Sequence, residues 1–321
     1  MARNSSVVLN GRAAQAGKTL LVRPAARRRL KQRDESTALW LTAPALVLAL
    51  AFIVYPVIET IRLSFFEWPG LGPATFVGLD NFVGLASDSD FATAVENNFL
   101  FAVVVTVGTV GLGTAFALAI DRRVAFWRVY RFVFFLPYIL PMTIVAIMWA
   151  NALDPNYGWL TGIVSLINPE WGVGALANPD TAMYVVCLVA IWQFAGFPMV
   201  MMLGSLSSIP RDIVEAARLD GAGPVQMAWR ISLPLCKDML TTVVLLQLIF
   251  SFKVFDLVQA LTGGGPGSST QVLGTLIFRE AFVEAKFGYA SAIALVASLS
   301  IIAISLVYLA VLKPGRIERQ G

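Results

Sequence analysis

The sequence has 321 residues, of which 57% are hydrophobic and only 14% are charged. A soluble domain carries about a quarter charged residues, and a mean hydropathy of +0.73 would leave large apolar patches on a soluble protein. Composition therefore excludes an ordinary soluble protein and indicates an integral membrane protein. The absence of histidine argues against a His-ligated metal site and against a His proton relay.

Residues 1–37 form a basic N-terminal tail that we predict to be disordered. Within it, the stretch GRAAQAGKT is similar to a phosphate-binding loop, which needs four residues between its two glycines. Here five residues separate Gly11 from Gly17, and no strand–helix unit surrounds them. We therefore expect this chain to bind neither ATP nor another cofactor.

Six stretches are long and apolar enough to cross a bilayer, which takes about 20 residues in a helix. The first is too long and too far from the N-terminus for a cleaved signal peptide. We predict an all-α domain of six transmembrane helices over 38–313, followed by a short C-tail, 314–321. The predicted spans are 39–61, 99–120, 131–153, 182–206, 239–261 and 290–312.

The distribution of Lys and Arg predicts the orientation of these spans. Most of the 24 basic residues lie in the two tails and in the loops 121–131 and 207–237, whereas the loops 67–95 and 154–180 carry none. The positive-inside rule then places both termini in the cytoplasm. Topology and contact with anionic membrane lipid account for the basic clusters, so we expect no nucleic-acid binding.

The predicted cytoplasmic loop 207–237 contains several residues that typically begin or end helices. Pro210 suits a first helical position, the Gly-Ala-Gly run at 221–223 stops the helix, and Pro224 can begin a second one. This pattern predicts a helix, a sharp turn and another short helix. On periodicity alone, an amphipathic helix lying on the membrane surface explains the first segment equally well.

The residues of this loop resemble the EAA motif of ABC-importer permeases. That motif reads Glu-Ala-Ala, three residues, Gly, nine residues, then Ile-x-Leu-Pro, and every fixed position and both gaps match. The resemblance implies that this loop is the coupling helix that docks on a separate ATPase. The residues it implicates are Glu215, Ala216, Ala217, Arg218, Asp220, Gly221, Ile231, Leu233 and Pro234.

A second stretch indicates which branch of the ABC-importer permeases the sequence resembles. Residues 252–282 and 287–294 resemble the fifth-span exit, outer loop and last-span start of the sugar-type branch, which includes maltose and glycerol-phosphate permeases. The resemblance implies a prokaryotic plasma-membrane complex of two permease chains, usually different, two ABC ATPase subunits and an extracytoplasmic solute-binding protein. ATP and Mg²⁺ would be bound by the ATPase. A di- or oligosaccharide is the expected substrate, with glycerol 3-phosphate or another polar solute as the alternative.

Polar and aromatic residues inside the predicted spans are candidates for the substrate pathway. Lys253 and Asp256 are three residues apart and could instead form an ion pair near the outer surface. Trp192 could stack on a sugar ring, although packing aromatics are commoner. The full set of pathway candidates is Gln247, Ser251, Lys253, Phe255, Asp256, Trp192, Gln193 and Asn151.

Two other classes explain the sequence less well. An autonomous secondary transporter usually carries an intramembrane acid or His relay, often within inverted repeats, and it would leave the EAA-like loop unexplained. A membrane enzyme needs a catalytic or metal-binding cluster, and no such spacing is present. Cys187 and Cys236 are expected to be reduced, small apolar residues.

Overall fold

The computed structural model describes residues 41–120, 126–167 and 174–312, so the predicted N-terminal and C-terminal tails lie outside the described residues. The chain divides into two compact units, Met1–Glu59 and Thr60–Gly321. In the first unit, residues 41–49 are α-helical and continue through η1 (Leu50–Val54) into the start of α2 (Tyr55–Leu63). This run of apolar residues covers most of the first predicted span.

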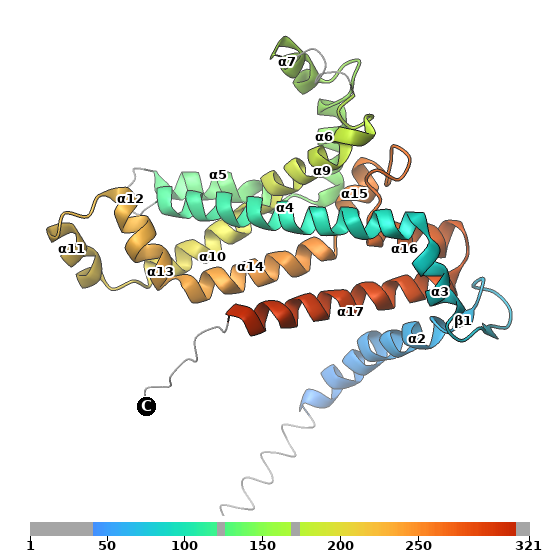
Figure 1. Ribbon diagram of the computed structural model, residues 1–321. Helices are drawn as coiled ribbons and strands as arrows, with labels where there is room; N and C mark the ends of the chain where they lie inside the picture. The colour runs from blue at the N-terminus through green and yellow to red at the C-terminus, as the bar shows by residue number, and fades with distance from the viewer. Residues whose placement is uncertain (1–40, 121–125, 168–173, 313–321) are drawn as a thin grey trace, which may run out of the picture. The chain divides into compact units, whose positions relative to one another are not determined.

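The second unit is almost entirely helical, with one small hairpin made of β1 (Phe66–Glu67) and β2 (Thr75–Phe76) (Figure 1). Its remaining elements, in chain order, are α3 (Asp80–Ser87), α4 (Ser89–Ala119), α5 (Trp127–Ile139), α6 (Met142–Ala152), α7 (Trp159–Ile167), α9 (Pro179–Phe194), α10 (Gly196–Ser207), α11 (Arg211–Leu219), α12 (Pro224–Gln226), η2 (Met227–Ser232), α13 (Leu233–Leu235), α14 (Lys237–Phe252), α15 (Asp256–Leu261), α16 (Leu273–Phe278), η3 (Arg279–Val283) and α17 (Phe287–Leu312).

Four helical runs among the described residues are long and apolar enough to cross a membrane on their own. Two further pairs of helices reach that length only if each bent pair counts as one span, which gives four to six candidate spans. The straight runs are Leu41–Leu63, Ser89–Ala119, Pro179–Ser207 and Phe287–Val311, and the bent pairs are Trp127–Ile139 with Met142–Ala152 and Pro224–Leu235 with Lys237–Phe252.

The third and fifth predicted spans are therefore not continuous helices, which corrects the expectation from the sequence. The third bends by 95° between α5 and α6, where Pro141 offers no backbone N–H and its ring disfavours a helical residue before it. The predicted fifth span, 239–261, stops being helical after Phe252 and resumes at Asp256 as the separate helix α15.

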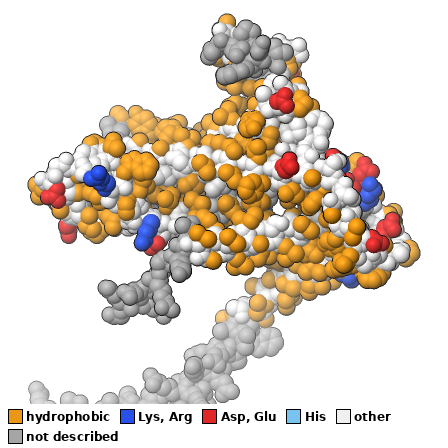
Figure 2. Space-filling view, viewed as in Figure 1, with side chains coloured by type: hydrophobic (Ala, Val, Ile, Leu, Met, Phe, Trp, Pro, Cys, Tyr) orange, Lys and Arg blue, Asp and Glu red, His pale blue; other side chains and the backbone are white. Residues whose placement is uncertain are grey.

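Helix α4 is the centre of the second unit. It packs against α9, α10 and α14, and α14 packs in turn against α17. Figure 2 shows hydrophobic side chains covering the sides of this helical body, with most charged side chains gathered toward its ends. That distribution suits a body surrounded by lipid and partner helices, with its charged ends in water.

A polar network ties the start of α4 to α17. The Asp88 carboxylate accepts hydrogen bonds from the Tyr289 hydroxyl at 2.6 Å and from the backbone N–H groups of Asp90 and Phe91. Arg279 forms an ion pair with Asp90 at 2.7 Å. Burial raises the pKa of Asp88, but these hydrogen bonds and the nearby guanidinium outweigh it and hold the pKa below its ordinary 3.8. The Asp88 carboxylate therefore stays ionised and caps α4 at neutral pH.

Close contact between α4 and α10 depends on Gly113. A Cβ atom there would lie 2.6 Å from the carbonyl oxygen of Ala195 and 2.8 Å from the backbone nitrogen of Met199. Small residues of this kind let two helix backbones approach each other inside a membrane. Gly111, two residues earlier on α4, has open space around the same position.

We expect Gly113→Ala to lower the stability of the protein by about 1–3 kcal/mol, because the added methyl group forces α4 and α10 apart. The thermal unfolding midpoint of the detergent-solubilised protein measures this loss. Gly111→Ala is the matched control and should leave the midpoint unchanged or slightly higher, since Ala is the better helix former. Equal midpoints for the two variants would show that the close approach at Gly113 is not needed.

Candidate coupling loop and translocation surface

The loop after α10 begins with the short helix α11. Pro210 is its N-cap, with φ −56°, so the helix starts one residue later than the sequence indicated. Asp212 lies in the first turn and Arg218 in the last, which places each charge at the end of the helix dipole that favours it. Local sequence alone thus favours helix formation here.

Gly221 ends this helix through a Schellman motif. Its φ is +82°, the left-handed conformation that glycine adopts at low cost. The Gly221 N–H donates to the carbonyl of Arg218, and the Ala222 N–H donates to that of Ala217, both at 3.0 Å. These two bonds satisfy carbonyls that a helix end otherwise leaves open. The fixed glycine of the EAA-like pattern therefore forms the turn that ends α11.

The second arm of the loop is anchored to the helical body. It runs through α12, η2 and α13, and Leu233 and the buried Cys236 pack in one cluster with Met199 and Met202 of α10. The Cys236 N–H donates to the carbonyl of Ser232 at 3.0 Å. This arm is therefore packed directly against α10 and α14.

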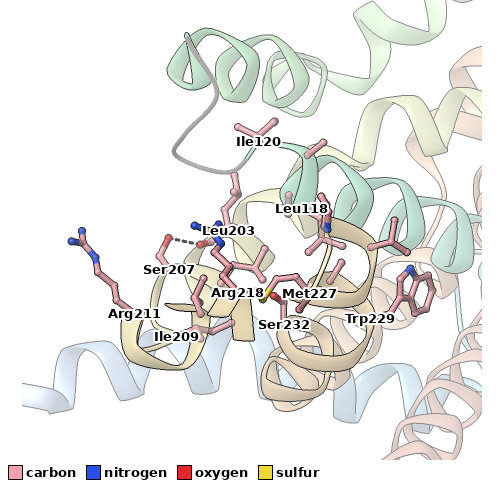
Figure 3. Close-up of a pocket in the computed structure, with 18 of the residues that line it drawn as sticks. Leu118, Ile120, Leu203, Ser207, Ile209, Arg211, Arg218, Met227, Trp229 and Ser232 are labelled. Atoms are coloured by element: carbon pink, nitrogen blue, oxygen red, sulfur yellow. Dashed lines mark hydrogen bonds between the residues drawn. The ribbon is translucent and has the colours of Figure 1, made fainter. Parts of the chain in front are cut away.

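The faces of α11 differ sharply. Ala217 is buried, whereas Glu215, Ala216 and Asp220 are exposed, and Leu219 is 89% exposed. A groove of about 960 Å³ separates α11 from the ends of α4 and α10. Figure 3 shows this hollow with Leu203, Ile209, Met227 and Ser232 around it. The loop therefore presents a short helix whose exposed face carries both apolar and charged residues.

The remaining motif residues lie on both sides of the same groove or behind it. Arg218 and Glu215 line the groove, and Ile231 is half-buried on η2. Leu233 is half-buried and Pro234 exposed on α13. The structure thus gathers the whole predicted motif into one helix–turn–helix unit.

The break between α5 and α6 is stabilised by a side chain from α9. The buried Gln193 donates from Nε2 to the carbonyl oxygen of Leu140 at 3.2 Å, just before Pro141. Without this bond the carbonyl would lose its partner in an apolar environment, which is costly. Beside the break, Tyr138 stacks on Phe197 with ring centroids 5.6 Å apart, and Phe197 meets Phe250 edge-on at 6.1 Å.

The end of α14 is held by Asn98, which is completely buried on α4. Asn98 donates from Nδ2 to the carbonyl of Phe252 at 3.2 Å and accepts at Oδ1 from the N–H of Leu273 at 3.3 Å. The neighbouring Asn97 donates to the carbonyls of Ser269 and Gln271, both at 3.0 Å. Two adjacent amides on α4 therefore fix the start of the non-helical stretch after α14 and the loop before α16.

Residues 109–314 match the family model described as binding-protein-dependent transport system inner membrane component. The chain belongs to this family. The match covers more than half of the sequence and includes α9 to α17, the coupling loop among them.

Relatives of this chain are similar to it in sequence over most of its length. It is 38% identical over 279 residues to a probable ABC transporter permease protein, YurN, of Bacillus subtilis, which covers 86% of this chain and 95% of the relative. It is 31% identical over 297 residues to the trehalose/maltose transport system permease protein MalF of Thermococcus litoralis, covering 91% and 97%.

Solved structures share its fold. A bacterial ABC transporter involved in the import of alginate contains a chain that superposes with a TM-score of 0.79 at 23% identity, covering 91% of this chain and all of that one. The two chains therefore share the same overall fold.

The candidate pathway residues fall into two groups that differ in solvent exposure. Three are buried within the chain, and five keep part or much of their surface exposed. The buried ones are Gln193, Gln247 and Ser251; the exposed or half-exposed ones are Asn151, Trp192, Lys253, Phe255 and Asp256.

An ion pair between Lys253 and Asp256 was the alternative to a role of these residues in the substrate pathway. Within the described part of the chain these two residues make no ion pair with each other. That alternative assumed that one helix carried both, but α14 ends at Phe252 and Asp256 opens α15. Residues three apart face each other only on a continuous helix, so both side chains are exposed separately.

Sequence reasoning missed the two asparagines that hold the end of α14 and the loop before α16. Asn97 and Asn98 are adjacent polar residues at the edge of an otherwise apolar span, and that position was the available signal. Tyr138, Phe197 and Phe250 were missed as well, because aromatic residues in apolar runs give no sign of which ones will meet.

We expect Asn98→Ala to destabilise the protein by about 1–3 kcal/mol, because the variant leaves a buried carbonyl and a buried N–H without partners. Thermal unfolding of the solubilised protein measures the effect. Asn151→Ala is the matched control, since Asn151 is exposed and its side chain donates a hydrogen bond to the carbonyl of Ile147, within its own helix. If both variants unfold at the wild-type temperature, Asn98 does not stabilise the end of α14.

Proposed function

We propose that this chain is a permease subunit of a binding-protein-dependent ABC importer for a carbohydrate, most plausibly a di- or oligosaccharide. It forms half of the translocation pathway together with a second, different permease chain. The observation that carries the proposal is the α11 loop, in which all residues of the EAA-like pattern lie in one helix–turn–helix unit packed against α10 and α14. The family membership supports the same assignment.

In this proposal two ATPase subunits bind ATP and Mg²⁺, and one of them receives α11 in a cleft. Glu215 supplies the charged contact, and the small exposed side chain of Ala216 allows close approach, whereas Ala217 is buried within this chain. Gly221 fixes the turn, so closure of the ATPase moves the loop as a lever instead of bending it. A flexible loop would absorb that motion.

The proposed topology has six spans, with each bent pair counted as one, and both termini in the cytoplasm of a prokaryotic plasma membrane. The α11 loop then lies on the cytoplasmic side, and the hairpin, α3, α16 and η3 lie on the outer side. An extracytoplasmic solute-binding protein delivers substrate to that outer side. The basic loops beside α11 and the absence of Lys and Arg from loops 67–95 and 154–180 support this orientation.

The pathway itself runs over surfaces that this chain leaves exposed, because the second permease forms the other wall. Lys253, Asp256, Asn151, Trp192 and Phe255 remain candidates for contact with substrate. The buried Gln193, Gln247 and Ser251 are better suited to packing between helices, so we assign them that role in the proposal.

The sugar class is supported by relatives whose names state their substrates. One is the trehalose/maltose permease of Thermococcus litoralis, and another is a multiple sugar-binding transport system permease of Streptococcus mutans, 32% identical over 253 residues. A glycerol 3-phosphate system permease of Salmonella choleraesuis is also 32% identical, over 244 residues. Glycerol 3-phosphate is therefore the alternative substrate class.

We expect Glu215→Lys to abolish the ATP hydrolysis that a substrate-loaded binding protein stimulates, while the chain still inserts in the membrane. The reason is that the substitution reverses the charge of the proposed ATPase contact without touching a buried group. The measurement is ATPase activity of the reconstituted complex with and without loaded binding protein. Gly221→Pro should act alike, because proline cannot adopt φ +82° and removes the N–H that bonds Arg218.

Glu96→Lys serves as the matched control, since Glu96 is also exposed but lies on α4 near the opposite end of the unit. It should retain the full stimulation. A Glu215→Lys complex that still responds to the loaded binding protein contradicts the coupling role of α11.

A further inference from the structure

Five aromatic rings follow one another from the break after α14 to the hairpin. Their successive centroid distances are similar: Phe255 to Phe278 5.6 Å, Phe278 to Phe282 5.4 Å, Phe282 to Phe287 5.8 Å and Phe287 to Trp68 5.5 Å. The rings come from five separate positions of the fold, on or beside α15, α16, η3, α17 and β1. We call this row the aromatic track.

The aromatic track is not a buried core. Phe282 is 69% exposed, and the other four rings each keep part of their surface exposed. Exposed charged residues are neighbours of three of the rings in the chain: Asp256 follows Phe255, Lys286 precedes Phe287, and Glu67 precedes Trp68. The segments that carry the rings therefore also carry exposed carboxylates and an ammonium group.

One end of the aromatic track lies at a polar groove, and the other lies at the break after α14. At one end, Trp68 lines a groove of about 810 Å³ together with Glu67, Glu284 and Lys286. At the other end, Phe255 lies in the non-helical stretch between α14 and α15, beside the pathway candidates Lys253 and Asp256. The track therefore connects a polar groove on the proposed outer side with the break in the fifth span.

We propose that the aromatic track binds the sugar rings of an oligosaccharide on its way from the outer groove to the break after α14. A pyranose ring has an apolar face of C–H groups, which stacks on the electron-rich face of an aromatic ring, and hydroxyls at its edge that pair with carboxylates. Successive rings at similar spacing let an oligosaccharide move without leaving all its contacts at once. The inference rests on the proposed function and specifies how the substrate travels.

Lipid suits this surface less well than carbohydrate does. Lys286 is 59% exposed and Glu284 48%, and both line the groove at the Trp68 end of the track. Charged side chains facing the hydrocarbon of a bilayer are costly, whereas they assist a ligand rich in hydroxyl groups. Packing of the second permease on Phe282 is the remaining alternative, and the experiment below distinguishes it.

The test uses the whole complex, with its own ATPase, second permease and binding protein, reconstituted in proteoliposomes. Uptake of radiolabelled trehalose, maltose, maltotriose, diacetylchitobiose and glycerol 3-phosphate identifies a transported substrate. For that sugar, Phe282→Ala should lower the uptake rate at saturating sugar about tenfold, the factor expected for loss of one stacking contact. Binding-protein-stimulated ATP hydrolysis should stay within about twofold of wild type, because α11 is untouched.

Two controls accompany this variant. Phe282→Tyr should restore uptake, because it keeps the ring. Phe99→Ala should leave uptake unchanged, because Phe99 is an exposed aromatic residue of α4 outside the track.

Each other outcome contradicts a definite part of the account. Normal sugar uptake by Phe282→Ala overturns the aromatic track and leaves the proposed function intact. Loss of the second permease from the purified Phe282→Ala complex overturns the track in favour of a protein interface. Uptake of glycerol 3-phosphate alone also overturns the track, since that substrate has no sugar ring. A wild-type complex that transports none of the five compounds with ATP contradicts the proposed function itself.

Discussion

A helix that breaks inside an apolar environment must find new partners for the backbone groups it releases, because no water is present to accept them. This constraint explains the most unusual contacts of the second unit. Gln193 of α9 bonds the carbonyl of Leu140 at the break between α5 and α6, and Asn98 of α4 bonds the carbonyl of Phe252 at the end of α14. Each break is therefore paired with a buried amide on a neighbouring continuous helix.

The same arrangement joins continuous and broken helices in one packed core. Helices α4 and α10 pack closely through Gly113. The broken elements α5–α6 and α14–α15 are attached to the continuous helices by buried apolar contacts, with Val145, Leu257 and Val258 in one cluster with Phe101 of α4. The hydrogen bonds of Gln193 and Asn98 add to this packing at the two breaks. The α11 loop is joined to α10 and α14, so a push on the loop reaches both kinds of element.

The features that could be predicted from the sequence were those set by local chemistry. The turn at Gly221 follows from the need for a left-handed residue after a helix. The apolar runs predicted the C-terminal end of the helix at 89–119, and both ends of the helix at 287–312, within a few residues. The contact at the break before Pro141 could not be predicted, because the carbonyl of Leu140 bonds to Gln193, 53 residues away. The alternative of a Lys253–Asp256 pair fails for a related reason, since α14 ends at Phe252, whose carbonyl bonds to Asn98. The aromatic track could not be predicted from the sequence, because its rings come from different elements.

The central claim is that this chain works as one part of an assembly powered by a separate ATPase. The most direct measurement is to tag the chain, extract native membranes in mild detergent, and identify the proteins that co-purify by quantitative mass spectrometry. The account predicts an ABC-type ATPase and a second permease chain in near-equal amounts. A chain that purifies alone, and that still transports a sugar after reconstitution without ATP, would contradict it.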